Sequence, residues 1–118
     1  YMHFDALAPS HEFAPVPLEN GCVTLHCTKD APCNFQLLET GTYSVQAHFV
    51  AHGSDMAQST TNILLNDSLL DTLQTNGTKD LWVTQELSRA TLEKGCYQLS
   101  LQIMKAGIEI DQFILKQI

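Results

Sequence analysis

The chain has 118 residues, 44% of them apolar, which is enough for one domain with a hydrophobic core. Its acidic residues outnumber its basic ones by 13 to 6, and the net charge of −7 argues against nucleic acid and anionic membranes as partners, because both need clustered Lys and Arg. No apolar run is long enough to cross a bilayer. Since the first residue is Tyr rather than Met, we expect a chain that is processed or cut from something longer, with any targeting signal outside it.

The first twenty residues contain three prolines and predict a loosely structured lead-in strand or arm. Four cysteines follow, and they permit three full pairings. Cys22 and Cys27 lie about 16 Å apart along an extended strand and face opposite ways, so they cannot bond directly. Cys27 and Cys33 flank a turn-like "TKDAP" and are the pair best placed to bond across a hairpin. We expect Cys22 and Cys96 to be buried thiols. A zinc site with His26 is disfavoured because no CxxC pair is present.

The rest of the chain alternates between apolar and polar residues, and no amphipathic helix is evident. In the strand expected over 43–51, one face carries Tyr43, Val45, Ala47, Phe49 and Ala51. In the next, the residues expected to face inward are Leu81, Val83, Gln85 and Leu87, with Trp82, Thr84 and Glu86 opposite. In the strand expected over 96–104, the inward residues are Tyr97, Leu99, Leu101 and Ile103.

Shorter strands are expected over 22–28, 34–38, 60–66 and 68–74, with turn signals at 39–41, 52–55, 65–67, 75–80 and 93–95. About eight short strands without helices predict an all-β fold, an antiparallel β-sandwich or barrel.

The last strand, within "GIEIDQFILKQI", changes its apolar parity midway. Ile108 and Ile110 share one face, whereas Phe113 and Leu115 fall on the other. We expect either that this strand lies under covering loops or that a β-bulge near Asp111 shifts the parity.

The order of five segments resembles the family 6 and family 35 carbohydrate-binding modules over about residues 30–117. These segments are "ETGTYSVQAHF", "ILLND", "TNGTKDLWVTQEL", "LEKGCYQLSLQI" and "GIEIDQFIL". The resemblance implies a jelly-roll sandwich attached to a glycoside hydrolase, and it implies a single module spanning 1–118.

In family 6 modules, a Trp and a Tyr hold a sugar ring, and an Asn before the closing Asp hydrogen-bonds it. By resemblance, Trp82 matches the Trp, Glu109 stands in the place of the Asn, and His26 stands in the place of the Tyr. The polar loop that contains Lys79 and Asp80 adds hydrogen-bonding groups to this candidate sugar site. Trp82 is either exposed for sugar stacking or packed beneath a neighbouring loop.

The family also carries a structural calcium, held partly by an acidic opening segment and partly by the closing Asp. The closing Asp is Asp111 here, and its candidate partner is Asp5 or Glu12. Calcium needs six or more oxygen ligands, so two carboxylates alone do not establish the site.

Other polar residues have simpler interpretations. Glu109 and Asp111 as a catalytic glycosidase pair are disfavoured, because both lie on one strand of a small sandwich. His48 and His52 are about 13 Å apart along a strand, too far to share a metal, and are expected to be solvated. The glycosylation sequons at Asn66 and Asn76 lie in turns, where Asn is common.

Together these features predict a non-catalytic accessory domain of a larger extracellular or periplasmic glycan-degrading enzyme, in which Trp82 stacks a neutral sugar. The alternative is a purely structural sandwich that packs on a catalytic domain and binds no glycan. An enzyme is the third and weakest hypothesis. The expected partners are carbohydrate and the parent catalytic domain, and the only cofactor considered is a structural calcium ion.

Overall fold

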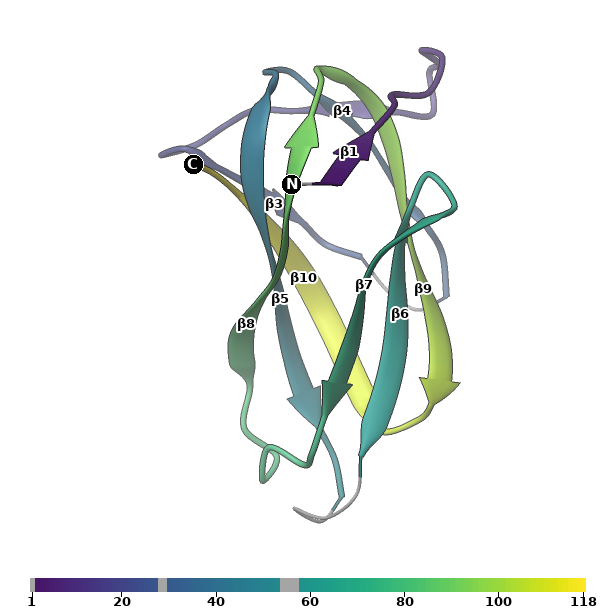
Figure 1. Cartoon of the computed structure of the whole chain (residues 1–118), viewed down its shortest axis with the longest axis vertical. Coiled ribbons are helices and arrows are strands. Elements are labelled where there is room, and N and C mark those ends of the chain that lie inside the picture. Colours follow the sequence, from purple (N-terminus) through teal and green to yellow (C-terminus); the bar gives the residue numbers. More distant parts are fainter. Residues whose placement is uncertain (1, 28–29, 54–57) are drawn as a thin grey trace.

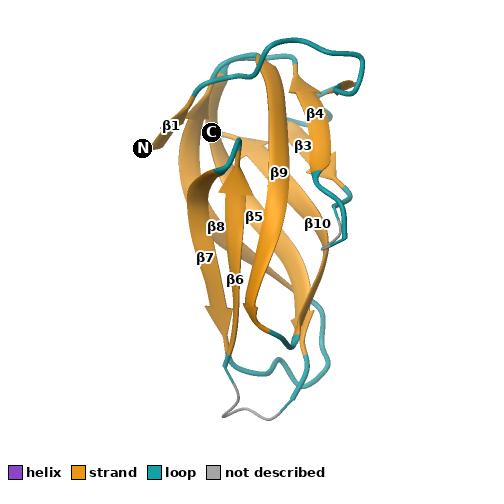
Figure 2. Cartoon of the chain, turned by 90° about the vertical axis from the view of Figure 1, so that its right-hand side faces the viewer, coloured by secondary structure: helices purple, strands orange, loops and turns teal. Residues whose placement is uncertain are grey.

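The chain folds into two facing β-sheets, as seen in a computed structural model that describes residues 2–27, 30–53 and 58–118 (Figure 1). Within these residues there is no helix, and therefore none with the length and apolarity to cross a membrane (Figure 2). One sheet has the strand order β1-β8-β5-β10-β3 and the other β2-β4-β9-β6-β7. This is the antiparallel sandwich that the alternating sequence predicts.

The ten described strands follow the predicted segments closely from residue 22 onward. Their bounds are β1 Met2–Phe4, β2 Ala14–Val16, β3 Cys22–Leu25, β4 Cys33–Leu37, β5 Gly41–Ala51, β6 Ser59–Leu65, β7 Ser68–Thr75, β8 Val83–Leu92, β9 Gly95–Lys105 and β10 Ile108–Gln117. All pairings are antiparallel except β1 with β8 and β2 with β4. The first twenty residues thus contribute a short edge strand to each sheet, rather than forming one loose arm.

The core fills the space between the sheets with large side chains. The alternation of β5 is confirmed, because the exposed fractions of its five predicted inward residues do not exceed 1%. Phe113 of β10 and Tyr97 of β9 are fully buried, and the ring of Tyr97 stacks on that of Phe35 with centroids 5.8 Å apart. Burial of these aromatic and aliphatic groups is the main force that holds the sheets together.

Several predicted turns adopt left-handed backbone conformations. Asn66 and Asp67, which join β6 to β7, have φ of 51° and 63°, and Lys79 and Asp80 in the loop before β8 have φ of 54° and 58°. Asn and Asp tolerate this region better than most residues, which is why "LND" and "NGTKD" are effective turn signals. Of the turn predicted at 52–55, positions 54 and 55 lie outside the described residues.

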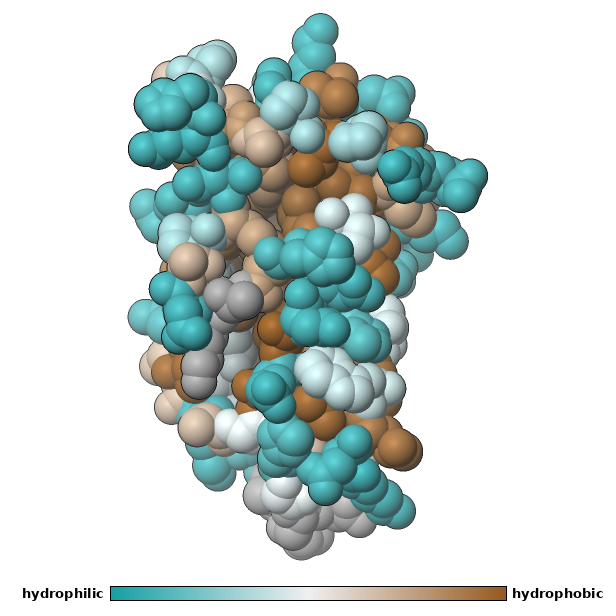
Figure 3. Space-filling model, turned by 180° about the vertical axis from the view of Figure 1, so that it is seen from behind, coloured by the Kyte–Doolittle hydropathy of each residue, from teal (hydrophilic) through white to brown (hydrophobic). Residues whose placement is uncertain are grey.

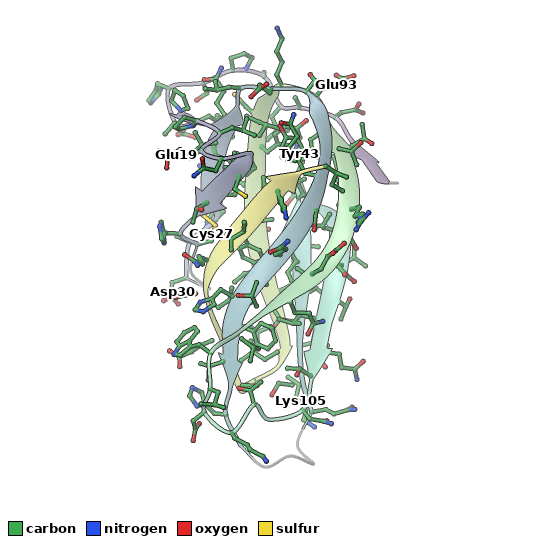
Figure 4. All side chains as sticks on the ribbon, turned by 90° about the vertical axis from the view of Figure 1, so that its left-hand side faces the viewer. Glu19, Cys27, Asp30, Tyr43, Glu93 and Lys105 are labelled. Carbon is green, nitrogen blue, oxygen red and sulfur yellow. A yellow bond between two sulfur atoms is a disulfide. The ribbon has the colours of Figure 1, made fainter. Side chains whose placement is uncertain are left out.

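A disulfide joins Cys27 to Cys33, with their Cα atoms 5.4 Å apart. The predicted pair is confirmed, but the expected hairpin is wrong: Cys27 follows β3 of one sheet and Cys33 begins β4 of the other. The bond therefore ties the two sheets together at one margin of the sandwich, where Figure 4 shows it beside Cys27. Cys22 and Cys96 are free thiols; Cys96 is buried and Cys22 is half-buried.

The parity change in β10 has the predicted cause. The register with β5 shifts between Ile110, which pairs with Phe49, and Gln112, which pairs with His48, so Asp111 is the extra residue of a β-bulge. Because of the bulge, Ile108 and Ile110 pack against the core from one half of the strand, and Phe113 and Leu115 are buried in it from the other.

The predicted inward face of the segment 81–87 is wrong in its first half. Leu81 lies in the loop before β8 and is 63% exposed, and Val83 and Gln85 are also exposed. β8 pairs with β1 only over Ala90–Leu92, so over its first residues it has a strand neighbour on the β5 side alone. The alternation of apolar and polar residues in this segment therefore does not lead to burial of its apolar side chains.

Candidate functional site

One margin of the sandwich stays open below the two short strands β3 and β4. Among the described residues, the pairing of β3 along β10 is limited to Phe113–Lys116, and the pairing of β4 along β9 is limited to residues 95–99. The first half of β10 and the last half of β9 are therefore sheet edges with backbone groups available to a ligand. A cavity of about 340 Å³ lies at this margin. Figure 3, a view from behind, shows a strip of apolar surface between polar side chains along the molecule.

The inner wall of the cavity is aliphatic. It is formed by Leu101 and Ile103 of β9 and by Ile108 and Ile110 of β10, with the buried Thr61 of β6 behind them. Ile103 faces inward as predicted, toward this cavity, but it is 42% exposed rather than buried, because the pairing of β4 with β9 stops at Leu99. The cavity therefore exposes aliphatic surface that a longer β4 would have covered.

Trp82 forms another part of the wall and follows a loop that is hydrogen-bonded to the end of β5. The Thr78 hydroxyl donates a hydrogen bond to the Leu81 carbonyl at 2.7 Å and accepts one from the Ala51 N–H at 3.0 Å. The indole of Trp82 stacks on the His48 imidazole, with ring centroids 5.2 Å apart and 15° between the planes. Its side chain is 46% exposed. One face of the indole is thus supported by protein, and much of the ring remains open to a ligand.

The polar rim consists of carboxylates. Asp30 comes from the β3–β4 connection and lies on the same margin as Cys27 (Figure 4), and Glu109 and Asp111 come from β10. The residues described along the lining include no Lys or Arg. Since carboxylates accept hydrogen bonds and do not donate them when ionised, this rim suits a ligand rich in hydroxyl donors.

Two histidines bind the carboxylates from the outer face of the sheet. The Nδ1 of His48 lies 2.7 Å from Oδ1 of Asp111. His52 bridges two elements, with Nδ1 at 2.7 Å from Asp80 and Nε2 at 2.7 Å from Glu109. Because both acceptors are carboxylates, both nitrogens of His52 must donate, which requires the protonated imidazolium. The hydrogen bonds to Glu109 and Asp80 accordingly raise the pKa of His52 above its ordinary value of 6.5.

The predicted sugar-site residues are brought together only in part. Trp82 and Glu109 line the cavity, and Asp80 reaches it through His52. His26 and Lys79 are exposed and do not belong to the described lining. The structure adds Asp30, which sequence reasoning did not single out.

His48 and His52 were expected to be solvated surface residues, and their side chains are indeed 27% and 49% exposed, but each also has a carboxylate partner that was not expected. His48 lies in β5 and His52 directly follows it, and β5 is the sheet neighbour of β10. His48 pairs with Asp111 of β10, and His52 pairs with Glu109 of β10 and with Asp80. The sequence signal that bears on them is the pair of acids in "EID" on a strand predicted to close the fold. To predict which histidine each acid bonds, one must know how β10 pairs with β5 on either side of the bulge, and the sequence does not show this register.

The two proposed calcium ligands have different hydrogen-bond partners in the structure. Asp111 is bonded to His48. Asp5 follows β1, and its carbonyl accepts a hydrogen bond from the Asn66 side chain at 2.7 Å in the β6–β7 turn. The part of the chain that the structure describes contains no group of three or more His, Cys, Asp or Glu residues that could hold a metal. Calcium at Asp111 and Asp5 therefore has no geometric support.

No protein-family model and no curated protein matches the chain by sequence. Among solved structures, it resembles a part of a β-glucosidase from Paenibacillus barengoltzii, with 31% identity and a TM-score of 0.78. That match covers 98% of this chain but 12% of the β-glucosidase, so the chain spans only a small part of that enzyme's length.

Two isolated modules also match. A family 35 carbohydrate-binding module from an environmental isolate has 19% identity and a TM-score of 0.58, covering 78% of this chain and 66% of the module. The C-terminal family 6 module of a marine laminarinase from Zobellia galactanivorans has 14% identity and a TM-score of 0.56, covering 80% of each chain.

These similarities define the class of the domain as a jelly-roll β-sandwich of the kind found in accessory modules. More particularly, the chain has the fold of the family 6 and family 35 carbohydrate-binding modules, as the order of its sequence motifs predicts.

Proposed function

We propose that this chain is a non-catalytic accessory domain that binds a neutral carbohydrate at the Trp82 cavity, within a larger extracellular or periplasmic glycan-degrading enzyme. The observation that carries the proposal is the half-exposed Trp82 indole, supported from behind by His48, at the rim of a carboxylate-lined cavity. The fold shared with carbohydrate-binding modules and the similarity to one segment of a β-glucosidase support it.

The chemistry of the cavity matches that of a pyranose ring. The C–H face of a sugar is apolar and stacks on an aromatic ring, while its hydroxyls seek hydrogen-bond acceptors at the edge. Trp82 provides the ring, and Asp30, Glu109 and Asp111 provide acceptors around it. Over 108–112, the edge of β10 that faces away from β5 adds both donors and acceptors.

The charge of the rim favours neutral sugars. Three carboxylates line the cavity in a chain whose net charge is −7, so a uronic acid would meet repulsion. Glu109 stands where the family 6 modules have an Asn. An ionised carboxylate accepts hydrogen bonds as an Asn side chain does, but it cannot donate them, so this position further favours ligand groups that donate.

The test is titration calorimetry with cello-, laminari- and galacturonate oligosaccharides on the wild type and on Trp82→Ala. We expect binding of at least one neutral series and none of the galacturonate series. Loss of the stacking anchor should weaken binding by about 2 kcal/mol, close to thirtyfold. Leu81→Ala is the matched control, because Leu81 is the neighbouring residue, is 63% exposed and is not part of the described lining.

Two outcomes would contradict this proposal. Unchanged affinity in a folded Trp82→Ala variant would move the sugar site elsewhere on the domain. Absence of binding to any glycan would favour a purely structural domain that packs on the catalytic domain of its parent enzyme.

A further inference from the structure

The cavity has two chemically different halves. On the side of Trp82, the rim is aromatic and acidic. On the side of β9, four aliphatic side chains from two different sheets form a continuous wall, and the only polar side chain behind them, Thr61, is 2% exposed. The two halves meet at the free edge of β10, whose residues contribute to both.

A sugar ring alone does not match the aliphatic half. A hydroxyl directed at the side chains of Leu101 or Ile103 would lose its hydrogen bonds to water and gain none from these side chains, which is costly. An apolar group placed there would instead remove aliphatic surface from water, which is favourable. The wall therefore selects a ligand group without hydrogen-bonding needs.

The size of the cavity limits that group. A volume of about 340 Å³ is near the lower end of the range of small-molecule sites, roughly 300–1,000 Å³. It accommodates a single sugar ring with a short substituent, but not a folded partner segment. The carboxylates on the rim place the hydroxyl-bearing part of the ligand beside Trp82 and leave the aliphatic half for the substituent.

We propose that the ligand is a neutral glycoside bearing an apolar substituent, such as an alkyl or aryl aglycone, with its sugar on Trp82 and its substituent against Leu101, Ile103 and Ile108. The proposal rests on the sugar-binding function of the Trp82 cavity and adds a preference for what the sugar carries. It makes the domain a receptor for substituted glycosides rather than for unsubstituted glycan chains alone.

The experiment compares methyl β-D-glucopyranoside with pentyl β-D-glucopyranoside. Trp82 is the only tryptophan in the chain, so its fluorescence reports occupancy of this site in both titrations. A fully buried methylene is worth about a fourfold gain in affinity. Since the wall is open on one side, we expect the pentyl glycoside to bind about tenfold more tightly than the methyl glycoside.

Two variants separate the wall from the rest of the site. Ile103→Asn places a polar group on the wall at a half-exposed position, and it should remove the pentyl preference, measured as the ratio of the affinities for the two glycosides. Met104→Asn is the control, because Met104 is adjacent, is 62% exposed and is not part of the described lining. It should keep the full preference.

The outcomes distinguish the two proposals. Equal affinities for both glycosides would overturn the substituent preference and leave sugar binding intact. A pentyl preference that survives in Ile103→Asn would place the substituent elsewhere and would also overturn it. If neither glycoside nor any neutral oligosaccharide binds, the sugar site itself is refuted, and the inference is refuted with it.

Discussion

Reduction of the Cys27–Cys33 disulfide should destabilise the fold by about 2 kcal/mol. The two cysteines are separated by six positions, and for a loop of this size the entropy that the cross-link removes from the unfolded chain corresponds to about 2 kcal/mol at 25 °C. For a domain of this length, that loss corresponds to a fall in thermal midpoint of about 8 °C. The bond also ties the two sheets together beside the cavity, so the connection that carries Asp30 should loosen when it is broken.

The assay is denaturant unfolding of the wild type with and without a thiol reductant, alongside Cys27→Ala/Cys33→Ala. Reductant should lower the wild-type midpoint and leave that of the double variant unchanged. Cys22→Ala is the control for thiol loss alone, because Cys22 is free, and it should respond to reductant as the wild type does. Alkylation of the unfolded, unreduced chain should label two thiols. Four labelled thiols would show that the disulfide is absent, and a wild-type midpoint that does not change with reductant would show that the disulfide does not stabilise the fold.

Two further predictions concern the histidine bridge and a glycine. The raised pKa of His52 means that its bridge contributes fully below pH 6.5 and is lost as pH rises through the folded-state pKa, so above pH 6.5 the wild-type thermal midpoint should fall relative to His52→Asn. Parallel pH profiles of the two proteins would show that the bridge contributes nothing. Gly107 has φ of 127° and an added Cβ would clash with the Ser59 side chain, so Gly107→Ala should cost about 1–3 kcal/mol in urea unfolding. Gly21→Ala, at φ of 76° with open space around the added Cβ, should cost less, and equal losses would contradict the clash.

Some features of the site could be predicted locally because each depends on a short segment. The parity change around Asp111 predicts either covering loops or a β-bulge, and the structure has the bulge, where an extra residue shifts the alternation of side chains. The spacing of Cys27 and Cys33 predicts their bond, because a six-residue separation keeps the two thiols close in almost any turn. The position of Trp82 opposite the inward residues, after a polar turn, left open whether the ring is exposed or packed beneath a loop, and the structure leaves it 46% exposed.

Other features depend on which strands end early, and no local pattern reports that. Leu81 and Val83 alternate as inward residues would, yet they are exposed, because Leu81 lies in the loop before β8 and the first residues of β8 have a strand neighbour only on the β5 side. Ile103 alternates with buried neighbours and becomes part of the cavity wall because β4 stops short. The burial of a side chain depends on how the two sheets are assembled. Alternation in the sequence therefore predicts which side of the strand a side chain lies on, but not how deeply it is buried.

The sequence by itself determined the all-β class, the turns, the parity change in the last strand and the residue types available for a sugar site, because these follow from backbone preferences and side-chain period over a few residues. Only the tertiary structure decided that His48 supports Trp82, that His52 joins Asp80 to Glu109, and that an aliphatic wall lies beside them. These groups are separated by up to 57 positions in the bridge of His52 to Glu109. They come together through the register between β5 and β10 and through the early ends of β3 and β4, both of which are set by packing of the whole sandwich.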